Sequence, residues 1–259
     1  MKPDRHTTQA DRDRELFDRI SDHYCRKDLS PASRPARRHR LLQTLCRTAL
    51  SSNDDILEVG CGAGFTADYL AGRFNSYTGV DYSSALIELA KDRWKNRAMP
   101  VTFSQCDATR MRSNNLFDGI IMVGVLHHME APIEALRSLR RLLKNGGWIA
   151  VNEPSSLNPV IQLLRRIRKR SDSTYSDEQR TYSPDELYAQ FAEAGFDQVE
   201  IRPQGLFSTP FAEVPVRPEC IFSILAKFAC ATDFILEKHL PGLIKPFSWS
   251  LIATARKNR

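Results

Sequence analysis

Apolar and polar positions alternate with two different periods along this 259-residue chain. Short apolar runs with the length and composition of buried strands occur at 54–59, 76–80, 101–105, 117–123 and 148–152. Between these runs, apolar residues recur at helical spacing over 65–73, 83–96 and 131–143. Strands that alternate with helices predict a parallel α/β sheet with right-handed crossovers.

The rest of the chain predicts additions to this alternation. Apolar residues at helical spacing indicate further helices at 11–29, 36–50, 184–194 and around 219–239. Two more short segments, 197–202 and 248–256, are expected to form strands. Residues 1–10 are expected to lack order, and residues 155–183 combine a short basic amphipathic helix with a polar stretch. We therefore divide the chain into an N-terminal helical lid (1–50), a core (51–155) and a C-terminal half (156–259) with insertions at 156–183 and 206–247.

Composition narrows the cellular setting. There is no long uncharged apolar run, so no transmembrane helix is expected, and the polar start does not resemble a secretory signal. Six cysteines form no C-x-x-C pair, which favours free thiols over a disulfide framework or a zinc site. We expect a cytoplasmic protein.

A net charge of +6 comes partly from two basic clusters, at 34–40 and 165–170. Both clusters suit solvated helix faces. Alternatively, they contact anionic lipid head groups or an acidic substrate, and the segment 163–170 would suit an interfacial helix at a membrane surface. No RNA-binding motif or basic surface interleaved with aromatic residues supports a nucleic-acid partner.

The chemistry is concentrated where the first predicted strand ends, at Glu58-Val59-Gly60-Cys61-Gly62-Ala63-Gly64. About twenty residues on, Asp81 closes the second strand. A strand, a glycine turn, a helix and a second strand ending in a carboxylate form a nucleoside-binding half-site. Glycines let the backbone approach a ligand closely, and Asp81 would accept hydrogen bonds from ribose hydroxyls.

The glycine spacing distinguishes between nucleoside ligands. In a dinucleotide site the third glycine comes one residue later, where this chain has Phe65, and no Lys-Ser or Lys-Thr follows as in a phosphate-binding loop. The stretch from Glu58 to Gly64 instead resembles motif I of the class I S-adenosylmethionine-dependent methyltransferases. Their ligand has an adenosine but no phosphate.

Three further segments carry the same resemblance: Cys106-Asp107-Ala108, Phe117-Asp118 and Leu143-Lys144-Asn145-Gly146-Gly147. It implies a Rossmann-like, seven-stranded, mostly parallel sheet with helices on both faces, with 248–256 as an antiparallel last strand and a helical cap from the insertions. It also implies S-adenosyl-L-methionine as cofactor, bound by Glu58, Gly60, Gly62, Gly64, Asp81, Tyr82, Asp107, Ala108 and Val123.

Within that set, the resemblance gives each group a role. The glycines bind the methionine end and Asp81 the ribose, while Asp107 accepts from the adenine amine and the Ala108 N–H meets a ring nitrogen. Glu58 either orients the glycine turn or meets the methionine amino group through water.

A general base is needed if the methyl acceptor is a hydroxyl or an activated carbon. His127 and His128 follow the fourth strand directly, at the edge of the sheet where ligands bind, and imidazoles ordinarily titrate near neutral pH. Glu153, at the end of the fifth strand, is a second candidate. Alternatively, one histidine caps the next helix or shapes the methionine pocket. The two histidines have no third ligand at metal spacing, so no metal site is expected.

The additions to the core are expected to select the acceptor. Phe17 and Tyr24 either close over the cofactor or pack their helix onto the domain. The apolar segment 221–231 either forms the core of the cap or lines a pocket for a greasy acceptor. The predicted function is O- or C-methylation of a small or lipid-like organic acceptor in a biosynthetic pathway, nearest the quinone-type and natural-product enzymes.

Two alternative functions come from other classes of protein. One is a non-catalytic partner subunit that keeps the fold. The other is an RNA or protein methyltransferase, although Val123-Gly124-Val125-Leu126 stands where base-modifying enzymes often carry an Asn-Pro-Pro-Tyr-like element. The sequence gives no oligomeric state.

Overall fold

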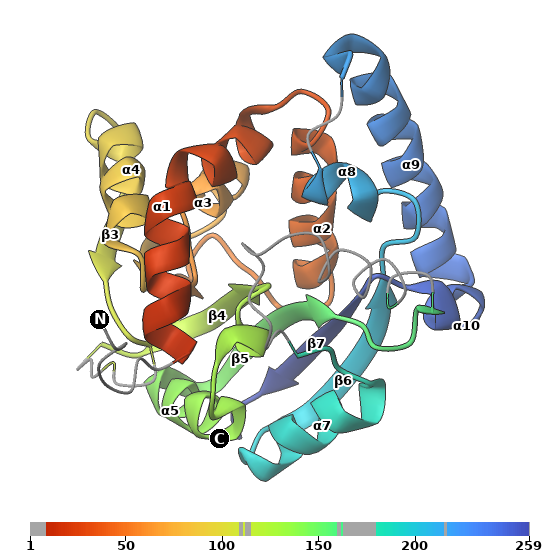
Figure 1. Cartoon of the computed structure of the whole chain (residues 1–259). Coiled ribbons are helices and arrows are strands. Elements are labelled where there is room, and N and C mark those ends of the chain that lie inside the picture. The colour runs from red at the N-terminus through yellow and green to blue at the C-terminus, as the bar shows by residue number, and fades with distance from the viewer. Residues whose placement is uncertain are drawn as a thin grey trace, which may run out of the picture.

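The computed structural model describes residues 9–108, 111, 115–159, 162, 180–214 and 217–258. Its centre is a seven-stranded sheet in the order β3-β2-β1-β4-β5-β7-β6 (Figure 1). The strands are β1 (Asp55–Val59), β2 (Ser76–Asp81), β3 (Val101–Gln105), β4 (Phe117–Val123), β5 (Leu143–Pro154), β6 (Asp197–Gln204) and β7 (Ser250–Arg256). The first five are parallel, and β7 pairs antiparallel with β5 and β6. The predicted Rossmann-like sheet is confirmed.

Helices cover both faces of this sheet (Figure 1). They are α1 (Gln9–Leu29), α2 (Arg34–Leu45), α3 (Phe65–Tyr69), α4 (Ser84–Trp94), α5 (Pro132–Leu142), α7 (Pro184–Glu193), α8 (Thr209–Glu213), α9 (Glu219–His239) and α10 (Pro241–Ile244), with 3-10 turns η1 (Leu126–His128) and η2 (Lys245–Phe247).

Neighbouring residues of the central strands enter two different cores, as the period of two in a strand requires. Leu57 and Ile120 pack with α5 and α7 on one face. Ile56 and Ile121 pack with α2, α3 and α4 on the other. Near-continuous apolar runs in the sequence therefore correspond to a sheet that is buried on both sides.

Some elements differ in extent from their predicted bounds. α3 ends at Tyr69, and Gly72 just beyond it has a φ of +78°, which breaks the helical path. β5 begins at Leu143 because that residue pairs with Phe117 across an irregularity in the ladder. The basic segment 163–170 lies outside the described residues.

The apolar segment 221–231 is divided between the two sides of α9. Ile221, Ile224 and Phe228 are exposed on the outer side of α9, whereas Ala226 is fully buried and the Phe222 ring packs against Phe211, so only the inner part of the segment packs as a core. None of them lines either cavity described below. No helix of the described residues is long and apolar enough to cross a membrane.

Candidate active site

The strand ends at the carboxyl edge of the sheet surround a cavity of about 640 Å³. Val59, Asp81 and Val123, the last residues of β1, β2 and β4, line it, and α1 contributes Phe17. A cavity of about 60 Å³ lies alongside. The residues that line both are Tyr24, Gly60, Gly62 and Val123. In an open α/β sheet this is the edge where ligands bind.

The glycine turn forms one wall of both cavities. Gly60 donates to Val80 O at 2.8 Å, which ties the turn to β2. Gly60 has a φ of +73°, and a Cβ there would lie 2.3 Å from Val125 Cγ2, so a side chain is excluded. At Gly62 an added Cβ would meet only Tyr24, at 3.8 Å, because the space beside it is cavity.

Gly64 differs from the other two glycines of the motif. It lines neither cavity. A Cβ at this position would lie 2.6 Å from the Phe103 ring, and the Gly64 carbonyl accepts a hydrogen bond from the Trp94 indole at 3.2 Å. The geometry therefore gives Gly64 a packing role rather than a place on the cavity wall.

Asp81 is held rigidly at the edge of the larger cavity. Its carboxylate accepts hydrogen bonds from the backbone N–H groups of Gly62 and Ser83, both at 2.9 Å. Burial raises its pKa, an effect that these N–H donors oppose. The structure brings Asp81 together with other predicted site residues, since Tyr82, Asp107, Ala108 and Val123 line the same cavity as the glycine turn.

Glu58 lies on the smaller cavity and is almost completely buried. The Tyr77 hydroxyl donates a hydrogen bond to its carboxylate. Burial raises the pKa of the Glu58 carboxyl to about 7, because the charged form loses its hydration. Glu58 is therefore a titrating group behind the glycine turn, close to where the resemblance puts the methionine end.

Substituting Glu58 should change how stability depends on pH. The folded protein holds this proton more tightly than the unfolded chain does between pH 4.5 and about 7, so this group's contribution to stability falls as pH rises through that window. A shift of this size corresponds to about 3 kcal/mol. Urea unfolding at the two ends of the window should show that Glu58→Gln lacks this part of the decline. An unchanged decline in the variant would contradict the raised pKa.

The two adjacent histidines of η1 have different surroundings. His127 is buried, and its Nδ1 lies 2.7 Å from Oε2 of Glu153. Glu153 is fully buried and also accepts from the backbone N–H groups of Val125, Leu126 and His127, at 3.0, 2.8 and 3.2 Å. Neither His127 nor Glu153 lines either of the two cavities described above. Their contacts fix the turn that carries His128.

His128 lines the larger cavity and contacts α1. Its Nδ1 lies 3.0 Å from Oδ2 of Asp13, and the Phe17 ring meets the imidazole edge-on with centroids 5.5 Å apart. Sequence reasoning missed Asp13. The sequence feature that could have identified Asp13 is its position four residues before Phe17, on the helix face that also carries Tyr24.

α1 is fastened across the cavity by a second aspartate. Asp18 accepts from the Ser83 hydroxyl at 2.5 Å and from the Ala85 N–H at 3.2 Å, at the start of α4. A carboxylate is favourable at a helix N-terminus, where backbone N–H groups lack partners. Phe17 and Tyr24 consequently lie on the cavity wall, so α1 covers the site as a lid would.

The larger cavity fits S-adenosylmethionine in size and charge. Its carboxylates outnumber its fixed cations: the lining includes Asp11, Asp13, Asp81, Asp107, Glu130 and Glu134, against Arg14. Such a lining suits a ligand that carries a sulfonium and an ammonium group, and it opposes a pyrophosphate. Two further features fit this ligand: the backbone at Gly62 borders open space, and Asp81 is held in place as a hydrogen-bond acceptor.

Comparison with known proteins identifies the family. Residues 26–201 match the family model described as a methyltransferase domain, and the chain belongs to this family. The ubiquinone biosynthesis O-methyltransferase of Nitrosospira multiformis is 26% identical over 164 residues, which cover 60% of this chain and 67% of that protein. Other relatives with that name are matched over 43% and 66% of their length, so the chain spans about two thirds of these relatives or less.

Solved structures show the same fold. A possible histamine N-methyltransferase from Thermotoga maritima superposes with a TM-score of 0.67 at 21% identity, covering 95% of this chain and 99% of that one. A Haemonchus contortus phosphoethanolamine N-methyltransferase in complex with S-adenosylhomocysteine gives a TM-score of 0.64 at 16% identity, covering 98% and 61%. The protein is an S-adenosylmethionine-dependent methyltransferase, and its relatives support a small-molecule acceptor.

Proposed function

We propose that this protein transfers a methyl group from S-adenosylmethionine to a hydroxyl or an activated carbon of a small or lipid-like organic acceptor in a biosynthetic pathway. The observation that carries the proposal is the pair of Asp13 and His128 on the wall of the larger cavity. When Asp13 accepts from Nδ1, the other ring nitrogen, Nε2, is left to take a proton. The name of the relative from Nitrosospira multiformis, an O-methyltransferase, supports an oxygen acceptor.

In this mechanism S-adenosylmethionine supplies, when bound, a methyl group that is already strongly electrophilic. His128 takes the proton from the acceptor hydroxyl, so that the oxygen lone pair is free to attack. Asp13 holds the imidazole in one tautomer and stabilises the imidazolium. Phe17 and Tyr24 exclude water, and the cavity aligns the two reactants, which accounts for much of the rate.

We assign the cofactor contacts by position around the cavity. Gly60 and Gly62 hold the methionine end, with Glu58 behind them. Asp81 accepts from the ribose hydroxyls, and Asp107 with the Ala108 N–H reads the adenine. Tyr82 and Val123 flank the adenosine. Gly64 is left out of this assignment because it lines neither cavity.

An amine acceptor is a second candidate, because of the same acidic lining that suits the sulfonium. A protonated amine would be attracted to these carboxylates and would then lose its proton to His128 before accepting the methyl group. This alternative uses the same cofactor contacts and differs only in the acceptor atom.

A methyl-transfer assay with isotopically labelled S-adenosylmethionine tests the proposal. The acceptors would be catechols and monophenols with and without an alkyl chain, primary and secondary amines, and bulk RNA and protein. The proposal expects labelling of a phenolic acceptor at a rate at least about tenfold above any amine. Preferred labelling of amines would favour the second candidate, and labelling confined to RNA or protein would contradict both.

A further inference from the structure

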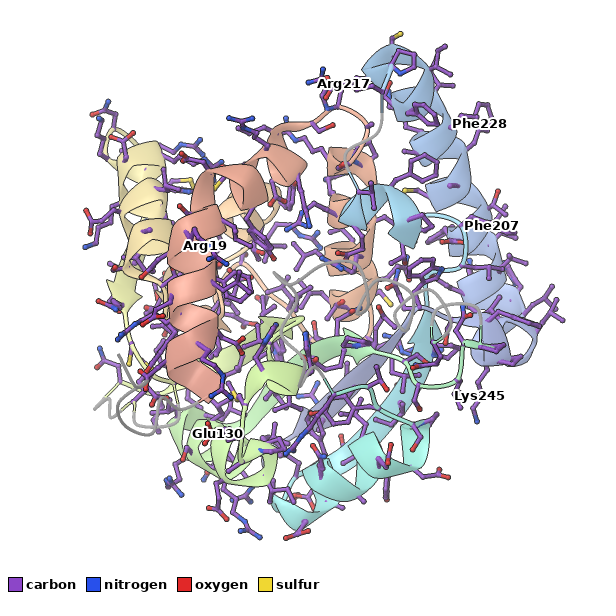
Figure 2. All side chains as sticks on the ribbon, viewed as in Figure 1. Arg19, Glu130, Phe207, Arg217, Phe228 and Lys245 are labelled. Atoms are coloured by element: carbon purple, nitrogen blue, oxygen red, sulfur yellow. The ribbon has the colours of Figure 1, made fainter. Side chains whose placement is uncertain are left out.

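α9 presents apolar side chains to the outside of the molecule. Phe228 is 69% exposed and Ile235 is 57% exposed, and both belong to a stripe at helical spacing. We define the outer stripe as Ile221, Ile224, Leu225, Phe228 and Ile235. Figure 2 shows Phe228 pointing away from the body of the protein. A helix packed on a domain in water ordinarily buries its apolar side.

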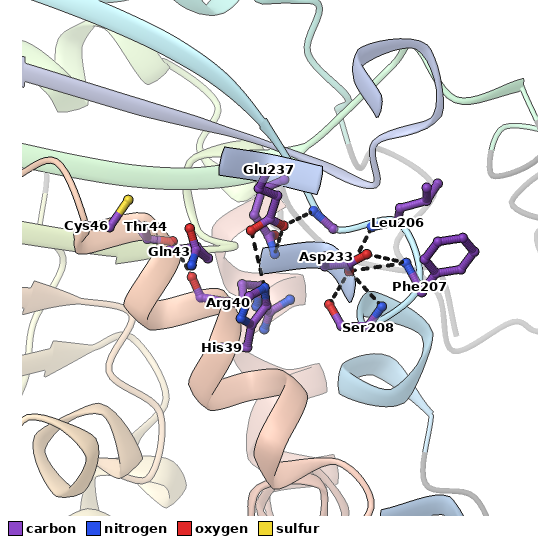
Figure 3. Close-up of polar contacts among 12 residues, drawn as sticks. His39, Arg40, Gln43, Thr44, Cys46, Leu206, Phe207, Ser208, Asp233 and Glu237 are labelled. Atoms are coloured by element: carbon purple, nitrogen blue, oxygen red, sulfur yellow. Dashed lines mark hydrogen bonds and ion pairs between the residues drawn. The ribbon is translucent and has the colours of Figure 1, made fainter. Parts of the chain in front are cut away.

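The side of α9 that faces the protein carries Ala226 and Phe222, together with two carboxylates that are bonded to a neighbouring loop (Figure 3). Asp233 is almost completely buried and accepts hydrogen bonds from the backbone N–H groups of Leu206, Phe207 and Ser208. The Ser208 hydroxyl adds another at 2.6 Å. A buried carboxylate is tolerated only with such partners. Asp233 therefore fixes which side of the helix faces inward.

Glu237 fixes the same orientation one turn further along. It accepts from the Gly205 N–H at 2.8 Å and lies 3.3 Å from Nε2 of His39 on α2. The ligand atoms of His39, Asp233 and Glu237 lie within 4.8 Å of one another, but both carboxylates already accept backbone N–H groups. We interpret the cluster as a brace between α2 and α9. Turning the outer stripe inward would break it.

The outer stripe continues beyond α9. Leu240 between α9 and α10, Leu243 on α10 and Phe247 on η2 are each about half exposed or more. Phe207, in the loop that Asp233 holds, is half exposed as well. Phe207 and Phe228 lie on the same side of the molecule in Figure 2. An apolar surface of this extent is rare on a protein that works alone in water, and it marks an interaction site.

The exposed charged side chains in the segment that carries this surface are mostly cationic. The exposed charged side chains from 217 to 247 are Arg217, Lys227, Lys238 and Lys245, with Glu219 as the exposed acid at one end. The other two acids of this segment, Asp233 and Glu237, face inward. An apolar stripe with a cationic border matches a bilayer surface that carries negative head groups.

We propose that α9, α10 and η2 bind the surface of an anionic lipid bilayer, with α9 lying in the interface plane. A second copy of the chain fits less well, because a two-fold dimer through this surface would bring the same cations together. None of the docking residues lines either of the two cavities described above, so this proposal goes beyond the proposed function and does not depend on it.

Co-sedimentation of the full chain with vesicles tests the proposal. The vesicles are phosphatidylcholine alone and phosphatidylcholine with phosphatidylglycerol. The apolar variant is Ile224→Asn with Phe228→Asn, and the charge variant is Lys227→Glu with Lys238→Glu. Tyr188→Asn is the matched control, because Tyr188 is 52% exposed on α7, away from this surface.

We expect the wild type and Tyr188→Asn to bind the anionic vesicles equally. The apolar variant should bind them at least about tenfold more weakly, and the charge variant should lose the preference for anionic over neutral vesicles. Circular dichroism and S-adenosylmethionine binding verify that each variant is folded. Absence of wild-type binding, or wild-type-like binding by both variants, would overturn the proposal. So would a concentration-dependent dimer, seen by sedimentation velocity, that the apolar variant abolishes.

Discussion

Replacing Asp81 with alanine is expected to lower the affinity for S-adenosylmethionine by a factor of roughly 10²–10⁴. The variant would lose the two hydrogen bonds that we propose between the ribose hydroxyls and this carboxylate, each contributing about 1.5–3 kcal/mol. The carboxylate is held ready by Gly62 and Ser83, so it does not need to be ordered on binding. Calorimetric titration of the folded variant measures the loss directly.

Asp118→Ala is the matched control for this substitution. Asp118 is also an aspartate on a central strand, β4. It lies at the opposite edge of the sheet, where it accepts from the Asp55 N–H at 2.8 Å and pairs with Lys144. We expect that variant to be less stable while its affinity for S-adenosylmethionine changes by less than about twofold. Wild-type affinity in folded Asp81→Ala would refute the ribose assignment.

The part of the candidate site on the glycine turn and at the end of β2 was predictable because its determinants are local in sequence. Gly60, Gly62 and Asp81 follow strands whose apolar runs are unambiguous, and parallel strands bring their carboxyl ends to one edge. The alternation and the family resemblance predicted seven mostly parallel strands with an antiparallel last strand, and the structure added their order. The sequence pattern does not separate Gly64 from Gly60 and Gly62, because the feature that distinguishes it is a three-dimensional contact with Phe103.

The catalytic half depends on contacts between distant residues. Asp13 and His128 are separated by 115 residues and meet because α1 packs across the cavity, where Asp18 bonds the start of α4. Glu153 ends a strand as Asp81 does, yet it faces the N–H groups of η1 rather than the cavity. Strand position alone does not tell these two cases apart.

α9 shows a different limit of sequence patterns. An apolar stripe has the same spacing whether it faces a protein core or an outside partner. The distinguishing feature was the opposite stripe, where Asp233 and Glu237 are four residues apart. Carboxylates ordinarily face the solvent, so the sequence alone would place this stripe on the outside. The side of α9 that faces the protein became clear only from the N–H groups of the loop 205–208, which donate to these carboxylates.

Replacing His128 with alanine is expected to lower kcat by a factor of about 10²–10⁴, the usual contribution of a general base. The affinity for S-adenosylmethionine should be nearly unchanged, because the ribose and adenine contacts do not involve this side chain. Asp13→Asn should lower kcat by a smaller factor and leave KM for the acceptor close to that of the wild type, since Asp13 acts by orienting the imidazole. Steady-state kinetics with the acceptor found in the labelling assay measure both effects.

Two comparisons separate a catalytic role for His128 from a structural one. Added imidazole should partly restore kcat in His128→Ala by entering the space that the side chain leaves in the cavity wall, and it should not restore Asp13→Asn. His127→Gln removes the ring that bonds buried Glu153, so it should lower the melting temperature more than it lowers kcat. If His127→Gln instead caused the larger loss of kcat while His128→Ala stayed near the wild type, the assignment of the base would be wrong.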